Sequence, residues 1–113
     1  MTNFKKVNKI TCENKAAFMM SFSVEYLSPE GDWTPTDWNS GSFPVVQAVT
    51  SPDFTSLSIP DDAIAVAAVV VAKPHRTLVR ASSVVAVRAE DEGIHATYVV
   101  EGILDNFSVK LRR

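Results

Sequence analysis

The sequence predicts an all-β protein built as a two-sheet antiparallel β-sandwich of about seven or eight strands. Short apolar segments recur along the whole chain and are separated by turn-forming residues, at the spacing typical of sandwiches. In several segments apolar and polar residues alternate, as in a strand with one face in a core and one in solvent. No segment shows a convincing helical periodicity.

The size and composition fit one domain that spans residues 1–113. A chain of 113 residues buries roughly two thirds of the surface that its unfolded form exposes. Hydrophobic residues make up 46% of the sequence, which is enough for a core. The net charge of −2 produces no strong field, so we expect no nucleic-acid partner.

The clearest strand lies at residues 16–27, which we predict to be central in a sheet. Six alternate positions of this segment are apolar: Ala16, Phe18, Met20, Phe22, Val24 and Tyr26. Residues 4–12 alternate more loosely and carry three lysines, which predicts an edge strand. Residues 13–15 then form a hairpin turn, and Cys12, the only cysteine, is expected to be a small buried residue.

Residues 28–32 (Ser-Pro-Glu-Gly-Asp) predict a turn. The following residues, 31–43, contain both tryptophans among Gly, Pro, Ser and Thr, which predicts a loop, with or without a short strand around Trp33. Residues 43–50 predict another strand, with Pro44 near its start.

Residues 64–72 are almost continuously apolar and rich in β-branched side chains, which predicts a strand that is covered on both faces. A short extended or single-turn element at 54–59 and a turn at 59–63 precede it. The basic residues 73–77 after it are expected to form a solvated loop.

Three more strands are expected in the last third of the chain, at residues 78–89, 94–101 and 107–111. The acidic residues 90–92 and Gly93 form a turn between the first two of them. The segment 107–111 places three apolar residues on one face and polar residues on the other.

No pattern of catalytic or metal-binding residues is present, so we expect no enzyme, no metal site and no cofactor. His75 and His95 have no neighbour at metal-ligand spacing. No nucleophile-elbow motif or glycine-rich phosphate loop occurs. The carboxylates at 61–62 and 90–92 are expected to be solvated turn residues, too few for calcium.

The segment with two tryptophans is the candidate ligand site. Exposed indole rings beside carboxylates and an amide could stack on a sugar, or could enter a lipid headgroup layer. The residues predicted to bind are Asp32, Trp33, Asp37, Trp38 and Asn39. The alternative is that Trp33 and Trp38 fold back as lids over the open ends of the sandwich.

Several segments together resemble the C-terminal β-sandwich domain of the thiol-activated, cholesterol-dependent cytolysins and their small stand-alone relatives. The resemblance rests on residues 17–26 (AFMMSFSVEY), 37–41 (DWNSG), 59–63 (IPDDA) and 98–109 (YVVEGILDNFSV). It implies an immunoglobulin-like sandwich that recognises a cell surface.

The chain departs from the family pattern at the motifs that contact cholesterol. Only residues 73–77 stand where the family has its tryptophan-rich undecapeptide, and Gly102 is followed by Ile103 and Leu104 instead of Thr-Leu. We expect no counterpart of the pore-forming domains within residues 1–113. The resemblance therefore implies the fold without implying cholesterol binding or pore formation.

Two hypotheses of function follow. The first is a non-enzymatic recognition module, toxin-like or lectin-like, that binds a cell-surface glycan or lipid through loops at the end of the sandwich. The second is a structural protein that forms homo-oligomers through sheet edges or faces.

The sequence shows no apolar segment after the N-terminal lysines and no run of about 20 apolar residues, so we expect neither a signal peptide nor a transmembrane segment. The protein is therefore expected to be soluble and cytoplasmic as synthesised, and export would need a route independent of a signal peptide.

Overall fold

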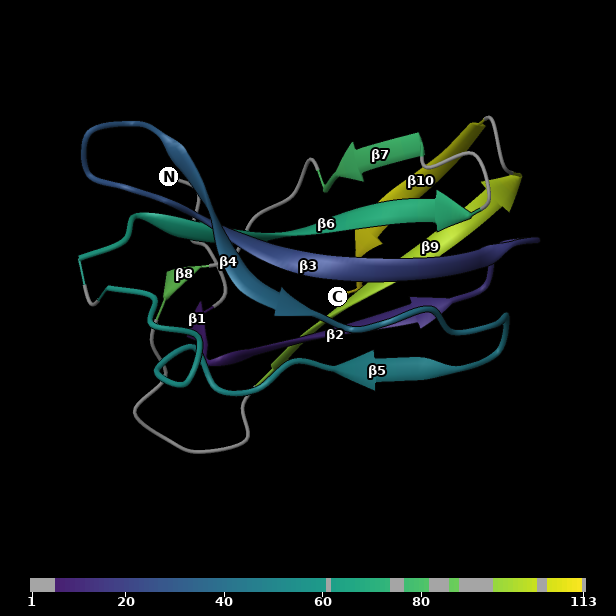
Figure 1. Cartoon of the computed structure of the whole chain (residues 1–113), viewed down its shortest axis with the longest axis horizontal. Helices are drawn as coiled ribbons and strands as arrows, with labels where there is room; N and C mark the ends of the chain where they lie inside the picture. The colour runs from purple at the N-terminus through teal and green to yellow at the C-terminus, as the bar shows by residue number, and fades with distance from the viewer. Residues whose placement is uncertain are drawn as a thin grey trace.

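The computed structural model describes residues 6–60, 62–73, 77–81, 86–87, 95–103 and 106–112. These residues form two four-stranded sheets that pack face to face, together with a small two-stranded sheet (Figure 1). None of the described residues is helical. The prediction of an all-β, two-sheet sandwich is therefore confirmed.

The first sheet has the order β10-β9-β2-β5. Its strands are β2 (Lys9–Asn14), β5 (Ala48–Thr50), β9 (His95–Ile103) and β10 (Asn106–Leu111). The pairs β10–β9 and β2–β5 are antiparallel, whereas β2 and β9 run parallel with Cys12 opposite Tyr98. One central pair of the sandwich thus differs from the antiparallel pattern expected of every pair.

The second sheet has the order β4-β3-β6-β7 and is antiparallel throughout. Its strands are β3 (Met19–Leu27), β4 (Trp33–Asn39), β6 (Ala65–Lys73) and β7 (Thr77–Arg80). The nine-residue strands β3 and β6 pair along their full length, and β3 is central, as the alternation in residues 16–27 predicts. The small third sheet pairs β1 (Lys6–Val7) with β8 (Ala86–Val87).

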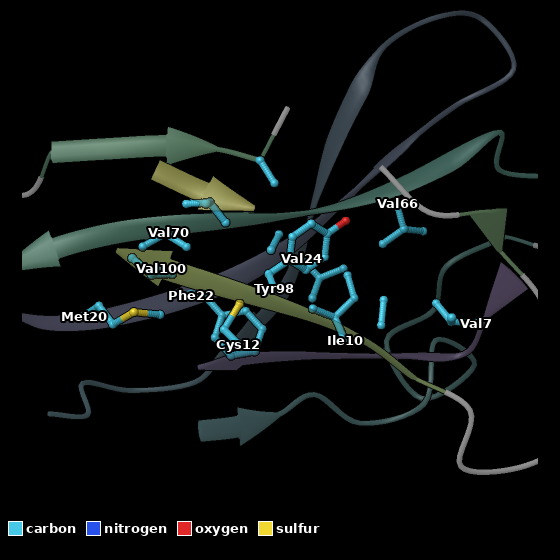
Figure 2. Packing of buried hydrophobic residues seen from close by; sticks show 14 of the residues in the cluster. Val7, Ile10, Cys12, Met20, Phe22, Val24, Val66, Val70, Tyr98 and Val100 are labelled. Carbon is cyan, nitrogen blue, oxygen red and sulfur yellow. The ribbon is translucent and has the colours of Figure 1, made fainter. Parts of the chain in front are cut away.

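The core lies between the two large sheets, whose inward side chains interdigitate (Figure 2). Its largest fully buried side chains include Tyr98 and Ile10 from the first sheet and Phe22 and Met20 from the second. Cys12 is fully buried among them, as predicted, and burial raises the pKa of its thiol.

Strand β6 is buried on both faces, which confirms the prediction from its apolar sequence. Val66, Ala68 and Val70 belong to the core. The alternate residues Ala65, Ala67 and Val69 are also buried, although they lie outside the core cluster. Their small side chains leave room on the outer face for longer side chains from neighbouring strands.

Two predictions about the first strands are wrong. The segment 4–12 is not an edge strand, because β2 lies between β9 and β5. Residues 13–15 do not close a hairpin either, since β2 and β3 belong to different sheets. One of the three lysines that suggested an edge, Lys9, lies at the start of β2 and forms an ion pair with Asp53 (3.6 Å), so β2 accommodates it in an interior position.

Two further segments differ from their predictions. The region predicted as a loop at 31–43 contains the seven-residue strand β4, because it pairs with β3 and Thr36 Oγ1 donates to the Val24 carbonyl (2.9 Å). The strand predicted at 43–50 is reduced to β5, since Pro44 and a turn over residues 44–47 occupy its first half.

The strands predicted in the last third of the chain are found in part. Of the strand predicted at 78–89, the structure describes β7 and β8, and residues 82–85 and 88–89 lie outside the described residues. Strands β9 and β10 agree with their predictions to within two residues.

Candidate functional site at one end of the sandwich

Exposed apolar side chains gather at one end of the sandwich, the end where β3 begins and β2 and β9 finish (right in Figure 1). We name Met19, Val45, Val46 and Ile103 the apolar tip; they are 43%, 47%, 86% and 62% exposed. Two other large apolar residues of the described chain are exposed, Leu78 on β7 and Ile64 at the opposite end. Clustered exposed apolar residues of this kind usually mark a surface that contacts another molecule.

The tip is built from two loops, residues 15–18 and 44–47, that are tied to the ends of the strands. The Ala17 amide donates to the Gly102 carbonyl (3.1 Å), which joins the first loop to the end of β9. The Val46 amide donates to the Asn14 carbonyl (2.7 Å), and the Asn14 amide donates to the Gln47 carbonyl (2.9 Å). The apolar side chains are therefore displayed on a fixed backbone.

The buried side chain of Asn14 holds the two loops together. Its Nδ2 donates to the carbonyls of Phe18 (2.8 Å) and Phe43 (3.2 Å), and its Oδ1 accepts from the Ala16 amide (3.0 Å). Both amide protons and one oxygen lone pair are therefore used, although the residue is completely inaccessible to solvent. A buried polar group with this many partners fixes local geometry, because no other side chain could replace all of its hydrogen bonds.

Val46 has a strained backbone at the centre of the second loop. The Gln47 amide donates to the Pro44 carbonyl (3.4 Å), and Val46, at the third position of this turn, has a φ of 78°. Glycine and asparagine are the usual residues there, and a β-branched residue with positive φ is unusual. Such strain costs about 1–3 kcal/mol. The chain thus places a strained and highly exposed valine where neither feature improves folding.

The other side of the tip is supported by an aromatic pair and a glycine. Phe18 packs against Phe107 with their ring centroids 4.9 Å apart. Gly102 has a φ of 128°, and a Cβ built on it would lie 2.5 Å from the Asn106 carbonyl oxygen. Only glycine therefore fits at this position of β9, opposite Phe107 and next to Ile103.

Two grooves flank residues 44–47. The larger, of about 470 Å³, is lined by Glu13, Asn14, Lys15, Val45, Val46, Ala48 and Arg112. The smaller, of about 240 Å³, is lined by Ala17, Phe18, Met19, Pro44 and Val45. Both share Val45 with the tip, and the larger one also contains charged groups. This end of the molecule therefore combines an apolar projection with a charged groove.

Trp33, predicted to bind a ligand, lies at the start of β4 and is half-buried on the outer face of its sheet. The guanidinium of Arg80 lies over its ring, 4.9 Å from the centroid. The same guanidinium donates from Nε to Glu25 Oε1 (2.9 Å). The cluster of Trp33, Arg80 and Glu25 crosses the sheet where β6 presents its small buried residues, Ala65 and Ala67.

Trp38 is half-buried and packs against the core, with its ring centroid 5.1 Å from that of Phe22. Asp32, Asp37 and Asn39 are exposed, and Asn39 Oδ1 accepts from the Gly41 amide (2.8 Å). Both indoles thus fold back onto the sandwich, onto a sheet face rather than over an open end. Sugar binding by the five predicted residues remains a prediction, and none of them lines the grooves at the apolar tip.

Other sequence-based candidates contribute no site among the residues described. His95 is exposed, and its Nδ1 lies 3.2 Å from Thr11 Oγ1. No three His, Cys, Asp or Glu side chains within these ranges lie close enough to hold a metal ion. His75, Asp61 and residues 90–92 lie outside the described residues. In the described part of the chain, no helix has the length and apolar character needed to cross a bilayer.

The apolar tip was not predicted from the sequence. Its residues lie at strand ends and in turns, where alternation carries no information about exposure. One signal was available: Pro44-Val45-Val46 places two valines directly after a proline, in a segment too short to complete a strand. The polar break at residues 13–15 also concealed Asn14, which resembles a solvated turn residue in the sequence but is fully buried.

Comparison with known structures finds the same fold in listeriolysin O, in a Gram-negative toxin and in the membrane-binding domain of pneumolysin. The chain superposes on listeriolysin O with a TM-score of 0.52 and 9% identity, covering 93% of this chain and 22% of that one. It superposes on the membrane-binding domain of pneumolysin with a TM-score of 0.50 and 8% identity, covering 94% and 96% of the two chains. A Gram-negative toxin gives a TM-score of 0.51 at 11% identity, over 96% of this chain and 23% of that one.

At the level of sequence, neither a family model nor a curated protein matches this chain. The chain spans less than a quarter of the length of the complete toxins that it superposes on. The structural likeness confirms the resemblance in fold to the cytolysin C-terminal domain. At these identities the likeness establishes the fold alone.

Proposed function

We propose that this protein is a non-enzymatic, toxin-like binding module that docks on a lipid surface through its apolar tip. The observation that carries the proposal is the display of four exposed apolar side chains at one end of the sandwich, on strand ends and on a loop that Asn14 holds in place. The likeness to a domain described as the membrane-binding domain of pneumolysin supports it. Cholesterol recognition forms no part of the proposal, because residues 73–77 and 102–104 differ from the family motifs that contact cholesterol.

The size of the tip sets the strength expected of this contact. Burial of a complete Val, Met or Ile side chain contributes about 1.5–3 kcal/mol. With the observed exposures, complete insertion of the four side chains is worth about 5 kcal/mol. That is close to the value of a single myristoyl chain, which gives marginal and reversible membrane binding. We therefore expect a peripheral and reversible association.

Sedimentation with phosphatidylcholine vesicles tests the proposal. Ile103→Ser should weaken binding several-fold, because Ile103 is 62% exposed at the tip. Ile64→Ser is the matched control, since Ile64 is 49% exposed but lies at the opposite end of the sandwich. Equal binding of wild type and Ile103→Ser, or equal weakening by both substitutions, would refute docking through the tip.

A glycan ligand at the edge strand β4 is the other form of the recognition hypothesis. Asp37 and Asn39 present polar groups on the exposed side of this strand. A glycan array tests it with Asp37→Ala, a change at an exposed residue that leaves the core contact of Trp38 intact. Sugar binding that this substitution weakens would favour a lectin-like module, and its absence would favour the lipid surface.

Self-association is a second candidate function, and one observation favours it. Strand β10 is the outermost strand of its sheet and offers a six-residue edge. An edge of this length can pair with another chain. Light scattering discriminates, because a stable monomer at micromolar concentration would contradict assembly through sheet edges.

A further inference from the structure

We infer that the larger groove beside the apolar tip receives the phosphodiester of an anionic phospholipid. This inference rests on the proposed docking of the tip on a lipid surface. An apolar tip worth about 5 kcal/mol gives only marginal anchoring, and stable anchoring takes a second signal such as basic groups beside the apolar anchor. The groove supplies such groups next to the tip.

The position of the groove matches the depth of lipid headgroups. Two of its lining residues, Val45 and Val46, also belong to the apolar tip. Apolar surfaces of interfacial proteins enter the boundary between headgroups and acyl chains by about 5–10 Å. When the two valines enter that layer, the rest of the groove lies among the headgroups.

The charges of the groove are complementary to one phosphodiester. Lys15 lies one residue beyond β2, is exposed, and forms no ion pair with the described residues. Arg112 forms an ion pair with Glu13, and its side chain is 46% exposed. Glu13, Lys15 and Arg112 together carry a net charge of +1, whereas a phosphodiester carries −1.

The two Arg–Glu pairs of the large sheets differ in what surrounds the guanidinium group. Arg80 reaches across β6 to Glu25, just as Arg112 reaches across β9 to Glu13. The Arg80 guanidinium is covered by the ring of Trp33, so its cation is already in contact with an aromatic face. The Arg112 pair instead borders an open groove of about 470 Å³ that is also lined by Lys15.

The walls of the groove favour a phospholipid over a sugar. Its apolar side consists of Val45, Val46 and Ala48, and no aromatic ring among the described lining residues could stack on a pyranose. Aliphatic walls next to two cations suit an anion that carries alkyl groups. The volume lies within the range of small-ligand pockets, about 300–1,000 Å³.

Vesicle sedimentation with two lipid compositions tests the inference. Wild-type protein should bind vesicles of phosphatidylcholine mixed with phosphatidylserine more tightly than vesicles of phosphatidylcholine alone. Lys15→Gln should weaken binding to the mixed vesicles about fivefold, the value of one lysine near an anionic surface, and leave binding to phosphatidylcholine unchanged. The gain from phosphatidylserine should disappear in 1 M salt, where the Debye length is about 3 Å.

Lys9→Gln is the matched control, because Lys9 begins the strand that Lys15 follows and lies at the other end of the sandwich. If Lys9→Gln weakens binding to mixed vesicles as much as Lys15→Gln, the attraction is diffuse and the groove is not the site. Binding to phosphatidylcholine without any gain from phosphatidylserine would overturn the inference and leave the proposed function intact. Binding to neither vesicle would refute both.

Inorganic phosphate separates a lipid site from a site for the free anion. Millimolar phosphate at constant ionic strength should leave wild-type protein on the mixed vesicles, because free phosphate lacks the apolar contacts that accompany the headgroup. Release of the protein by phosphate, with Lys15→Gln insensitive to it, would show that the groove binds free phosphate and would overturn the assignment to a lipid.

Discussion

Val46→Asn is expected to make the protein more stable and a weaker binder of lipid at the same time. Val46 has a φ of 78° and is 86% exposed. Asparagine tolerates positive φ, and so little of the valine is buried that its loss costs almost nothing in packing. The substitution therefore relieves strain in the folded protein while it removes an apolar group from the tip.

The magnitudes follow from the two features separately. The strain is about 1–3 kcal/mol, and we expect asparagine to recover about 1 kcal/mol of it. In a domain of this size that raises Tm by about 4 °C. Loss of an inserted valine removes about 2 kcal/mol from membrane binding, which weakens it about thirtyfold.

Thermal unfolding and sedimentation with phosphatidylcholine vesicles measure the two effects, and Val46→Thr is the control. Threonine is also β-branched and therefore keeps the strain, but it replaces a methyl group by a hydroxyl. It should leave Tm unchanged and still weaken binding. If Val46→Asn is no more stable than Val46→Thr, the strain argument fails; if both bind vesicles like wild type, Val46 does not enter the lipid.

Three other perturbations test the supports of the tip and the core. Asn14→Ala should lower the free energy of unfolding by about 3 kcal/mol, measured by urea denaturation, because it leaves buried backbone groups without their partner; a loss below 1 kcal/mol would contradict its role. Gly102→Ala should lower the free energy of unfolding by at least 2 kcal/mol in the same assay, because the added Cβ would overlap the Asn106 carbonyl. An unchanged free energy of unfolding would show that β9 and β10 can shift to accommodate the methyl group. Burial raises the pKa of Cys12 above its ordinary value of 9.0 and that of Tyr98 above 10.0, so both groups titrate earlier in the unfolded chain. Their contribution to stability is complete below pH 9 and should fall at higher pH by about 1.4 kcal/mol per pH unit for each titrating group; Cys12→Ala should abolish the part of this fall between pH 9 and 10.

The sequence predicted two kinds of strand correctly: those with one face in the core and one towards solvent, and the strand that is buried on both faces. Residues 16–27 alternate because β3 has one face in the core, and residues 64–72 are uniformly apolar because β6 is covered on both sides. The pairing partners could not be predicted in the same way. Whether β2 is interior or at an edge depends on β9, a strand more than eighty residues away in the sequence that lies parallel to it.

The prediction for the tryptophan segment allowed a short strand around Trp33 but missed the length of β4, for a similar reason. Gly, Pro, Ser and Thr indicate a loop locally, yet residues 33–39 pair with β3 and bury Trp38 against Phe22. Trp33 was expected in solvent or over an open end of the sandwich. It instead meets Arg80, which lies two strands beyond its own neighbour β3, a contact that only the complete sheet brings about.

The apolar tip is where local sequence preference and the folded structure disagree, and that disagreement is the strongest reason to place function there. Along β3 and β6, propensity, pattern and burial all favour the same structure. At the tip a valine occupies a position suited to glycine, several apolar side chains face solvent, and a polar Asn14 is buried to hold their loops. The strained valine and the exposed apolar side chains are unfavourable or neutral for stability, and Asn14 stabilises the arrangement that displays them. A chain selected for folding alone would have no reason to combine these features. The combination is explained if the exposed side chains are needed in one fixed arrangement against a second surface.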